Sequence, residues 1–227
     1  MNFNFLLKSV LIKYIIFKVK IHFARSNIMK KVVSLILCAL MLTGIMCGFS
    51  GCANVEMTEE NITDTVTKAE VALQEFNTKD LKKYVDSKTL DVIIPIAEKK
   101  EAFQTLGKAM FSNLKMEVKS IDTEKGTVTV DVINKNLVVD ATAFAYELKS
   151  NYSTTQLLNK LNDDEFINEK LNPLIEKIDK AEMQKEKTEI TLKVNQGKRN
   201  LVLTFDDEGE DAVSGGALSA IKSAFGA

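Results

Sequence analysis

The residues best suited to nucleophilic or zinc chemistry all lie near the beginning of this chain. Its single histidine is His22, and its three cysteines are Cys38, Cys47 and Cys52, so residues 53–227 contain neither residue type. Ser-His-Asp and Cys-His catalysis need a histidine beside the nucleophile, and zinc sites are built mainly from histidine and cysteine. Beyond Cys52 the chain is therefore limited to the chemistry of paired carboxylates, lysine, tyrosine or oxygen-coordinated metal ions.

Charge is distributed as unevenly as these reactive residues. None of the 31 acidic residues precedes Cys52, whereas seven of the 30 lysines and arginines do. Residues 52–227 therefore carry 23 basic and 31 acidic side chains, which gives a net charge of about −8. Such a balance argues against nucleic acid as a partner and against electrostatic attraction to anionic lipid.

Residues 29–51 have the three parts of an export signal. Met29-Lys30-Lys31 is a short cationic start, and Val32 to Met46 is an apolar stretch. Small residues, Ser50 and Gly51, then stand immediately before Cys52. This order of cationic, apolar and small residues is typical of a signal peptide that is removed after export.

The end of this segment, Phe49-Ser50-Gly51-Cys52, resembles the lipobox of bacterial lipoproteins, with Phe49 in place of the usual leucine. The resemblance implies cleavage after Gly51 and attachment of diacylglycerol and palmitate-type chains to Cys52. The protein would then be lipid-anchored at the extracytoplasmic face of the cell membrane. An uncleaved anchor is the alternative, because Val32 to Val55 is free of charge for 24 residues and is long enough to span a bilayer. We favour lipidation because a cysteine follows two small residues.

Residues 1–28 do not fit this scheme. They are apolar residues interrupted by lysines, and their composition is what AT-rich DNA encodes. We expect translation to begin at Met29 and residues 1–28 to be a gene-model artefact. A genuine long cationic leader is the alternative.

After a short tether over residues 52–59, we expect a single α+β domain over 60–227 that ends in an amphipathic segment. Helical spacing of apolar residues begins after a cap at Thr58 or Asn61, and we expect 78–80 to interrupt it. The positions on this first helical face are Ile62, Val66, Ala69, Leu73 and Phe76.

Two further stretches have helical periodicity. The first runs over residues 90–114, where we expect Pro95 to break the early part. Phe103, Leu106, Met110 and Leu114 mark its buried face. The second covers 140–183, with a break expected at Asn172-Pro173. Its expected helix starts are Asp140, then Ser153 or Thr154, then Asp163-Asp164-Glu165.

Between and after these helices the apolar period changes from 3.6 to 2. Alternating runs joined by short Gly-containing loops predict β-hairpins over 116–132 and 189–205. We expect both hairpins in one antiparallel sheet, because each has one apolar face to bury. The positions expected to be buried are Val128, Val130, Val132, Ile190, Leu192, Val194, Leu201 and Leu203.

The order helices, hairpin, helices, hairpin indicates helices packed on one face of a curved antiparallel sheet. It resembles the nuclear-transport-factor-2-like (cystatin-like) roll, and in particular small lipoproteins of low-GC Gram-positive bacteria of unknown function. The resemblance covers residues 60–225 and implies a pocket between sheet and helices. The segments that carry it are Asp80 to Tyr84, Val138-Val139-Asp140, Gly197-Lys198 and Ser214 to Leu218.

Two groups of residues are candidates for a site. The run Asp206 to Asp211 could bind Ca²⁺ through oxygen ligands, but it lacks the EF-hand order. We favour a solvated loop after an edge strand, for which Asp/Glu→Asn/Gln changes would alter stability by less than about 1 kcal/mol. Tyr84, Tyr146 and Tyr152 could line a cavity, although the edge of the core is the commoner place for tyrosine.

The sequence therefore favours a non-catalytic binding module, with no catalytic residue, cofactor or metal site. Its expected partners are the membrane, through the lipid on Cys52, and a small apolar ligand, a wall component or an envelope protein. Two alternatives stay open. One is an envelope interaction protein without a ligand pocket, and the other is an enzyme that uses carboxylates or tyrosine.

Overall fold

The structure, a computed structural model, describes residues 55–225. The expected lipidation site Cys52, the cleavage residues 49–51 and the leader all lie outside these residues. Asn54–Ala227 form one compact unit, and the described residues contain their own hydrophobic core. A unit of this kind can in principle fold alone. Within residues 55–225 no helix is long and apolar enough to cross a membrane.

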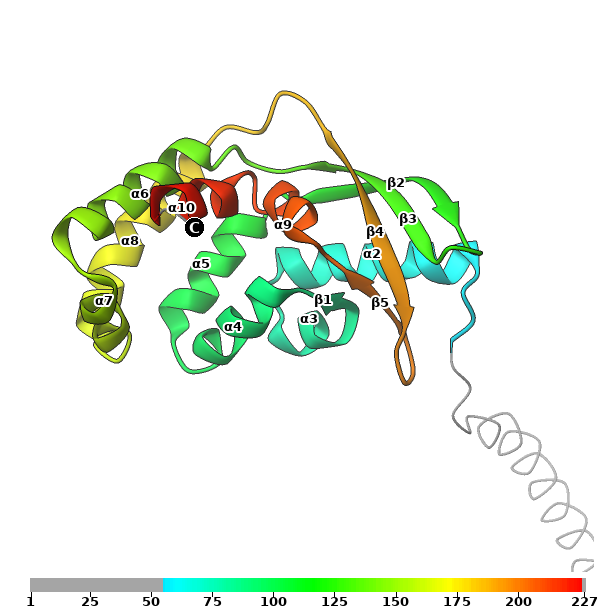
Figure 1. The fold of residues 1–227 in the computed structure, drawn as a ribbon, viewed down its shortest axis with the longest axis horizontal. Coiled ribbons are helices and arrows are strands. Elements are labelled where there is room, and N and C mark those ends of the chain that lie inside the picture. The colour runs from blue at the N-terminus through cyan, green and yellow to red at the C-terminus, as the bar shows by residue number, and fades with distance from the viewer. Residues whose placement is uncertain (1–54, 226–227) are drawn as a thin grey trace, which may run out of the picture. The chain divides into compact units, whose positions relative to one another are not determined.

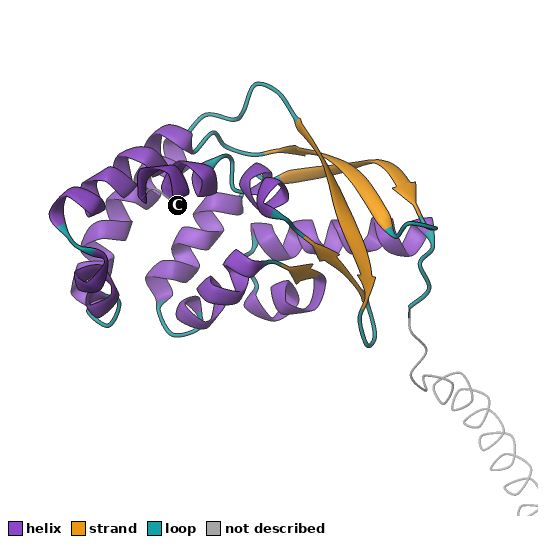
Figure 2. Cartoon of the chain, in the orientation of Figure 1, coloured by secondary structure: helices purple, strands orange, loops and turns teal. Residues whose placement is uncertain are grey.

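The two predicted hairpins form and belong to one sheet. Each strand pairs antiparallel with the next along the chain, so Val130 lies opposite Ile190 and Val194 lies opposite Leu203. Figure 1 shows the four strands in sequence order, and Figure 2 shows that they curve. Their bounds are β2 (Lys115–Asp122), β3 (Thr127–Ile133), β4 (Thr188–Gln196) and β5 (Leu201–Thr204).

A fifth, two-residue strand makes the sheet mixed. β1 (Val85–Asp86) pairs parallel with β5, which gives the strand order β1-β5-β4-β3-β2. The expectation of a wholly antiparallel sheet was therefore wrong at this edge, and β5 is not an edge strand. The sequence gave no sign of β1 because two residues are too few to have a period.

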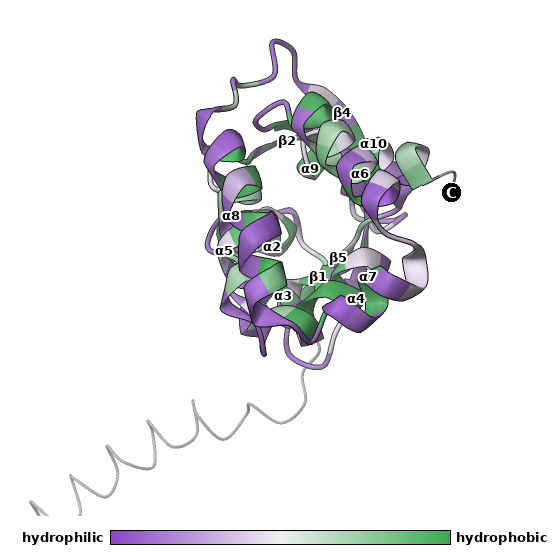
Figure 3. Cartoon of the chain, turned by 90° about the vertical axis from the view of Figure 1, so that its left-hand side faces the viewer, coloured by the Kyte–Doolittle hydropathy of each residue, from purple (hydrophilic) through white to green (hydrophobic). Residues whose placement is uncertain are grey.

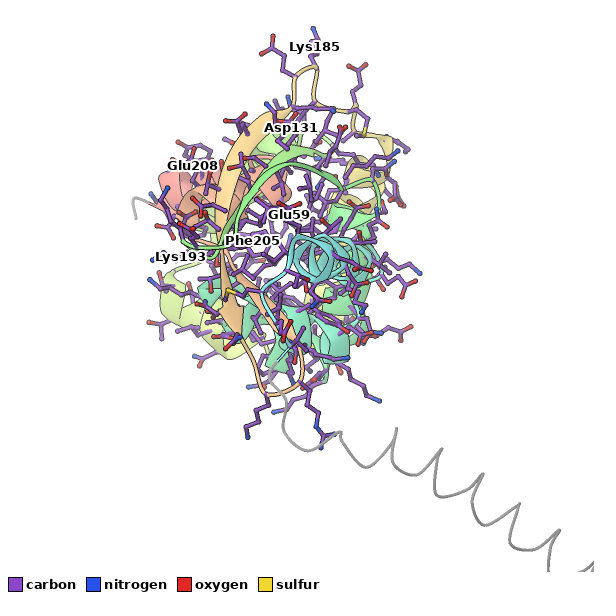
Figure 4. All side chains as sticks on the ribbon, turned by 90° about the vertical axis from the view of Figure 1, so that its right-hand side faces the viewer. Glu59, Asp131, Lys185, Lys193, Phe205 and Glu208 are labelled. Carbon is purple, nitrogen blue, oxygen red and sulfur yellow. The ribbon has the colours of Figure 1, made fainter. Side chains whose placement is uncertain are left out.

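All eight positions expected to face the core are buried, with exposed fractions between 0% and 4%. The opposite face of the sheet is polar, where Thr129 and Thr191 form a cross-strand hydrogen bond of 3.1 Å. Figure 4 shows Asp131 and Lys193 on this outer side. The sheet therefore buries one face only, and the helices cover that face, as predicted for this α+β fold.

The first helix, α2 (Glu59–Gln74), starts at the predicted cap Thr58, whose side chain accepts a hydrogen bond from the Asn61 N–H. It lies across the buried face of the sheet (Figure 1). The predicted interruption at 78–80 was wrong. The chain turns at Phe76, which has a φ of +47°, and residues 78–80 begin the next helix, α3 (Thr78–Tyr84), capped by Asn77.

Two prolines expected to break helices lie inside them instead. Pro95 is within α4 (Lys88–Ala97), and Pro173 is within α8 (Asp164–Lys180). Both prolines are on the exposed side of their helix, where water can satisfy the backbone carbonyl that proline leaves unpaired. Burial of the apolar face on either side of each proline keeps the helix continuous.

The remaining helices build the part of the domain away from the sheet. Ser153 caps α7 (Thr154–Lys160) and Asp163 caps α8, as predicted. The prediction that Asp140 caps a helix was wrong, because Asp140 lies in the first turn of a helix that begins after Leu137. The bounds are α5 (Glu101–Phe111), α6 (Val138–Asn151), α7 (Thr154–Lys160), α9 (Asp207–Val213) and α10 (Ala217–Phe225).

Buried side chains fall into two clusters. The larger one contains the inner face of the sheet, α2, α3 and α4, and its members include Leu73, Leu81 and Val130. The smaller one lies among α5, α6, α8 and α10, and its members include Ala141, Leu171 and Ala220. Side chains of α5 border both clusters, so this helix lies between a sheet-based core and a helical core.

Candidate ligand-binding pocket

A pocket of about 330 Å³ lies where the two clusters meet. Its walls come from α4, α5, α6, α8 and α10, and the residue after β5, Phe205, contributes at the sheet side. Figure 3 shows these helices and α7 from the end of the domain at which α7 lies. The volume is at the lower end of the 300–1,000 Å³ range of small-molecule sites.

Apolar side chains make up almost all of the lining. Phe103, Leu106 and Met110 are only partly buried, although the sequence predicted them on the buried face of their helix. The predicted face is correct, but it faces this pocket rather than a filled core. The same is true of the partly buried Phe144, Leu148, Leu218 and Ile221, which line the pocket from α6 and α10.

One carboxylate lies in this apolar wall. Glu210, from α9, is only 4% exposed. Its Oε1 accepts hydrogen bonds from Ser87 Oγ at 2.6 Å and from the Thr89 backbone N–H at 3.1 Å. Its Oε2 accepts a hydrogen bond from Thr89 Oγ1 at 2.5 Å. These bonds join α9 to the first turn of α4, where Ser87 is the N-cap and accepts from the Leu90 N–H.

Sequence reasoning missed Glu210 as a site residue. The run from Asp206 to Asp211 was expected to be a solvated loop, and that expectation was wrong. Asp206 caps α9, because its Oδ1 accepts from the Gly209 N–H at 2.9 Å, and the helix turns Glu210 inward. One signal was available: Glu210 and the apolar Val213 are three residues apart and share a helix face.

A lysine lines another part of the pocket. Lys170, on α8, has a side chain that is 19% exposed, and its Nζ lies 3.2 Å from carboxylate oxygens of Glu147 and Glu169. The hydrogen bond to Glu147, followed by the one to Glu169, raises the pKa of Lys170 above its ordinary value. The ammonium is therefore fully charged at neutral pH and already has two anionic partners.

None of the tyrosines considered as cavity residues lines the pocket. Tyr84 is buried in the larger cluster, with Lys83 Nζ 4.6 Å from its ring centroid. Tyr146 is 54% exposed on α6. Tyr152 packs edge-on against Phe166, with ring centroids 5.2 Å apart. Tyr84 and Tyr152 therefore support the packing rather than a site.

A second hollow, of about 460 Å³, lies at the start of α5 and has a polar lining. Lys100 and Asp164 form an ion pair of 2.5 Å there, and the Asp164 side chain is 73% exposed. The Asp164 carboxylate is solvated and is already paired with Lys100, so this hollow is a weaker candidate than the apolar pocket. Among residues 55–225 no group of three or more His, Cys, Asp or Glu side chains is placed to hold a metal ion.

Comparison with known proteins identifies no relative: no protein-family model, curated protein or solved structure matches this chain.

Proposed function

We propose that this protein is a lipoprotein whose domain, residues 54–227, binds a small apolar ligand and does no catalysis. The observation that carries the proposal is the apolar pocket of about 330 Å³ between the two buried clusters. Cavities of this size are the usual places for small-molecule binding, because they remove most of a ligand's apolar surface from water.

The side chains of the pocket support binding rather than catalysis. Among the described residues that line the pocket, Glu210 is the only one with a carboxylate, whereas acid–base hydrolysis of the glycosidase type needs two. Ser87 donates to Glu210, but its Oγ also caps α4, so it is held as a structural group. A carboxylate-dependent enzyme is therefore the less favoured alternative.

In fold, we place the domain closest to the cystatin-like roll of the nuclear-transport-factor-2-like proteins. A curved sheet covered by helices on one face, with a pocket beside it, is consistent with that assignment. The parallel β1–β5 pair departs from the wholly antiparallel sheet that we expected for this roll.

An envelope interaction protein is the second candidate. Its specific support is the outer face of α6, where Val139 is 75% exposed and Tyr146, seven residues later, is 54% exposed. Two large apolar side chains on one helix face are a small patch by the standard of protein interfaces. Ligand binding is therefore the preferred function.

The anchoring part of the proposal predicts a processed form that begins at Cys52. Expressed in a bacterial host, the protein should carry a diacylglycerol mass increment, and Cys52→Ala should accumulate as unprocessed precursor, because the thiol accepts the lipid before cleavage. Intact mass spectrometry of membrane fractions measures both. A mature protein whose N-terminus lies upstream of Cys52 would contradict the prediction.

The binding part predicts that the domain takes up an apolar dye. N-phenyl-1-naphthylamine should bind saturably, and Leu106→Trp should weaken binding at least tenfold, because the larger ring occupies the pocket. Val139→Trp is the matched control, since it adds the same ring on the exposed face of α6. Dye titration measures both, and circular dichroism checks the fold. Equal affinity in the two variants, or no saturable binding by the unaltered domain, would overturn the proposed function.

A further inference from the structure

The hydrogen bonds of Glu210 leave part of its carboxylate unused. Ser87 Oγ accepts from the Leu90 N–H, so its single proton is free to be donated to Glu210. Three donors therefore contact the carboxylate, two on Oε1 and one on Oε2. An ionised carboxylate has about four acceptor positions. One position on Oε2 has no donor among the residues that the structure describes.

The carboxyl group of Glu210 also lacks a cationic partner. None of the ion pairs formed within residues 55–225 includes Glu210, and all three of its donors are neutral groups. A carboxylate that is 4% exposed has lost most of its hydration, and buried charges in proteins are normally paired. The pocket therefore presents to its ligand a carboxyl group that has no cationic partner among the described residues.

Lys170 does not make the pocket suited to an anionic ligand. Its ammonium is engaged by Glu147 and Glu169, so an anionic ligand would have to compete with two carboxylates already in place. The two charged residues of the lining differ in this respect: Lys170 has opposite charges beside it, whereas Glu210 has only neutral donors. A cationic group on the ligand would therefore supply the partner that Glu210 lacks.

We propose that the ligand is a small cationic amphiphile, whose protonated amine donates to Glu210 Oε2 and whose apolar tail fills the pocket. This inference rests on the proposed function and adds the chemical class of the ligand. Glu210 lies at the end of the pocket near the sheet, since α9 packs on β3 and β4. The tail extends between α5 and α6 toward Leu157 of α7.

Three probes with the same tail test the charge preference. At about 30 Å³ for each water-sized group, the pocket volume of about 330 Å³ suits a chain of roughly ten carbons. Decylamine, decanol and decanoate compete with N-phenyl-1-naphthylamine for the domain at pH 7, where the amine is protonated, as a lysine side chain is. We expect decylamine to bind at least tenfold more tightly than decanol, and decanoate to bind most weakly.

Glu210→Gln assigns this preference to the carboxylate. Glutamine keeps the shape and an oxygen for Ser87 and the Thr89 N–H, but it removes the charge. We expect the variant to bind decanol within about threefold of the unaltered domain and to lose the tenfold advantage of decylamine. Glu208→Gln is the matched control, because Glu208 is exposed on the same helix (Figure 4) and its loss removes an equal charge.

The outcomes separate the two proposals. If none of the probes displaces the dye and the dye itself fails to bind, the proposed function fails. If decanol or decanoate binds the unaltered domain as tightly as decylamine, the pocket binds ligands but the inference is wrong. The inference is also wrong if Glu208→Gln lowers the decylamine preference as much as Glu210→Gln does. The comparison of probes on the unaltered domain decides the matter even where a variant fails to fold.

Discussion

Replacing Glu210 with alanine is expected to lower the free energy of unfolding of the domain by about 3 kcal/mol. The change removes the acceptor of Ser87 Oγ, Thr89 Oγ1 and the Thr89 N–H together. A buried donor left without a partner costs about 1–3 kcal/mol, and relief of the buried charge offsets part of the loss. Urea unfolding followed by circular dichroism measures the difference.

The matched control is Glu208→Ala, which removes the same charge from an exposed position on α9 and should change stability by less than about 0.5 kcal/mol. Glu210→Gln should lie between the two, because glutamine can still accept from Ser87. Similar losses in both alanine variants would show that the stabilising effect of α9 does not come from Glu210. The loss expected at Glu210 is larger than the change of less than about 1 kcal/mol predicted for residues 206–211 as a solvated loop.

Gly107→Ala is expected to destabilise the domain by about 2 kcal/mol. Alanine inside a helix normally stabilises it by up to about 1 kcal/mol relative to glycine. Here a Cβ at residue 107 would lie 2.5 Å from three ring carbons of Phe76. Phe76 is 3% exposed and stacks on Phe111, with ring centroids 6.2 Å apart, so its ring must leave this stack and move into the pocket that it borders to make room. Overpacking of this kind costs about 1–3 kcal/mol.

A double-mutant cycle with Phe76→Leu tests this explanation. The smaller side chain makes room for the Cβ, so Gly107→Ala should cost at least about 1 kcal/mol less in the Phe76→Leu background. Gln104→Ala, at an exposed position of the same helix, controls for helix propensity and should be nearly neutral. A stabilising effect of Gly107→Ala in the unaltered domain would contradict the packing described for Phe76.

The two hairpins of the sheet could be predicted from the sequence because the alternation of apolar and polar residues lies within each strand. Val128, Val130 and Val132 alternate with polar residues, and only one register buries all of them. The same reasoning holds for Ile190 and its neighbours on β4. The two hairpins therefore followed from a period of two, without any knowledge of which helices cover them.

The site could not be predicted in this way, because its polar group is defined by a distant contact. Glu210 and Glu208 are the same residue type on the same helix, and one is buried while the other is exposed. What distinguishes them is Ser87, 123 residues earlier in the chain. The spacing of Glu210 and Val213 indicates a shared helix face, but no local pattern around Asp206 to Asp211 identifies Ser87 as the partner of Glu210.

Tertiary packing also overrode one local rule. Phe76 takes a positive φ at the end of α2, where glycine is usual. Its N–H bonds to Leu73 O and the Asn77 N–H bonds to Ala72 O, which is the Schellman pattern. The stacked ring on Phe111 stabilises a backbone conformation that the residue type disfavours. The predicted helix boundary was therefore displaced toward residue 80.

The parallel pair of β1 and β5 has a consequence for the order in which the domain can form. Val85 pairs with Leu203, so β1, which is near the start of the domain, cannot pair until β5, the last strand, is present. Contacts between residues so far apart in sequence slow folding, because a long loop must close before they form. A nascent chain that ends before Leu201 lacks the strand with which β1 pairs and which α3 contacts. The β1–β5 pair therefore forms only after nearly all of the domain has been synthesised.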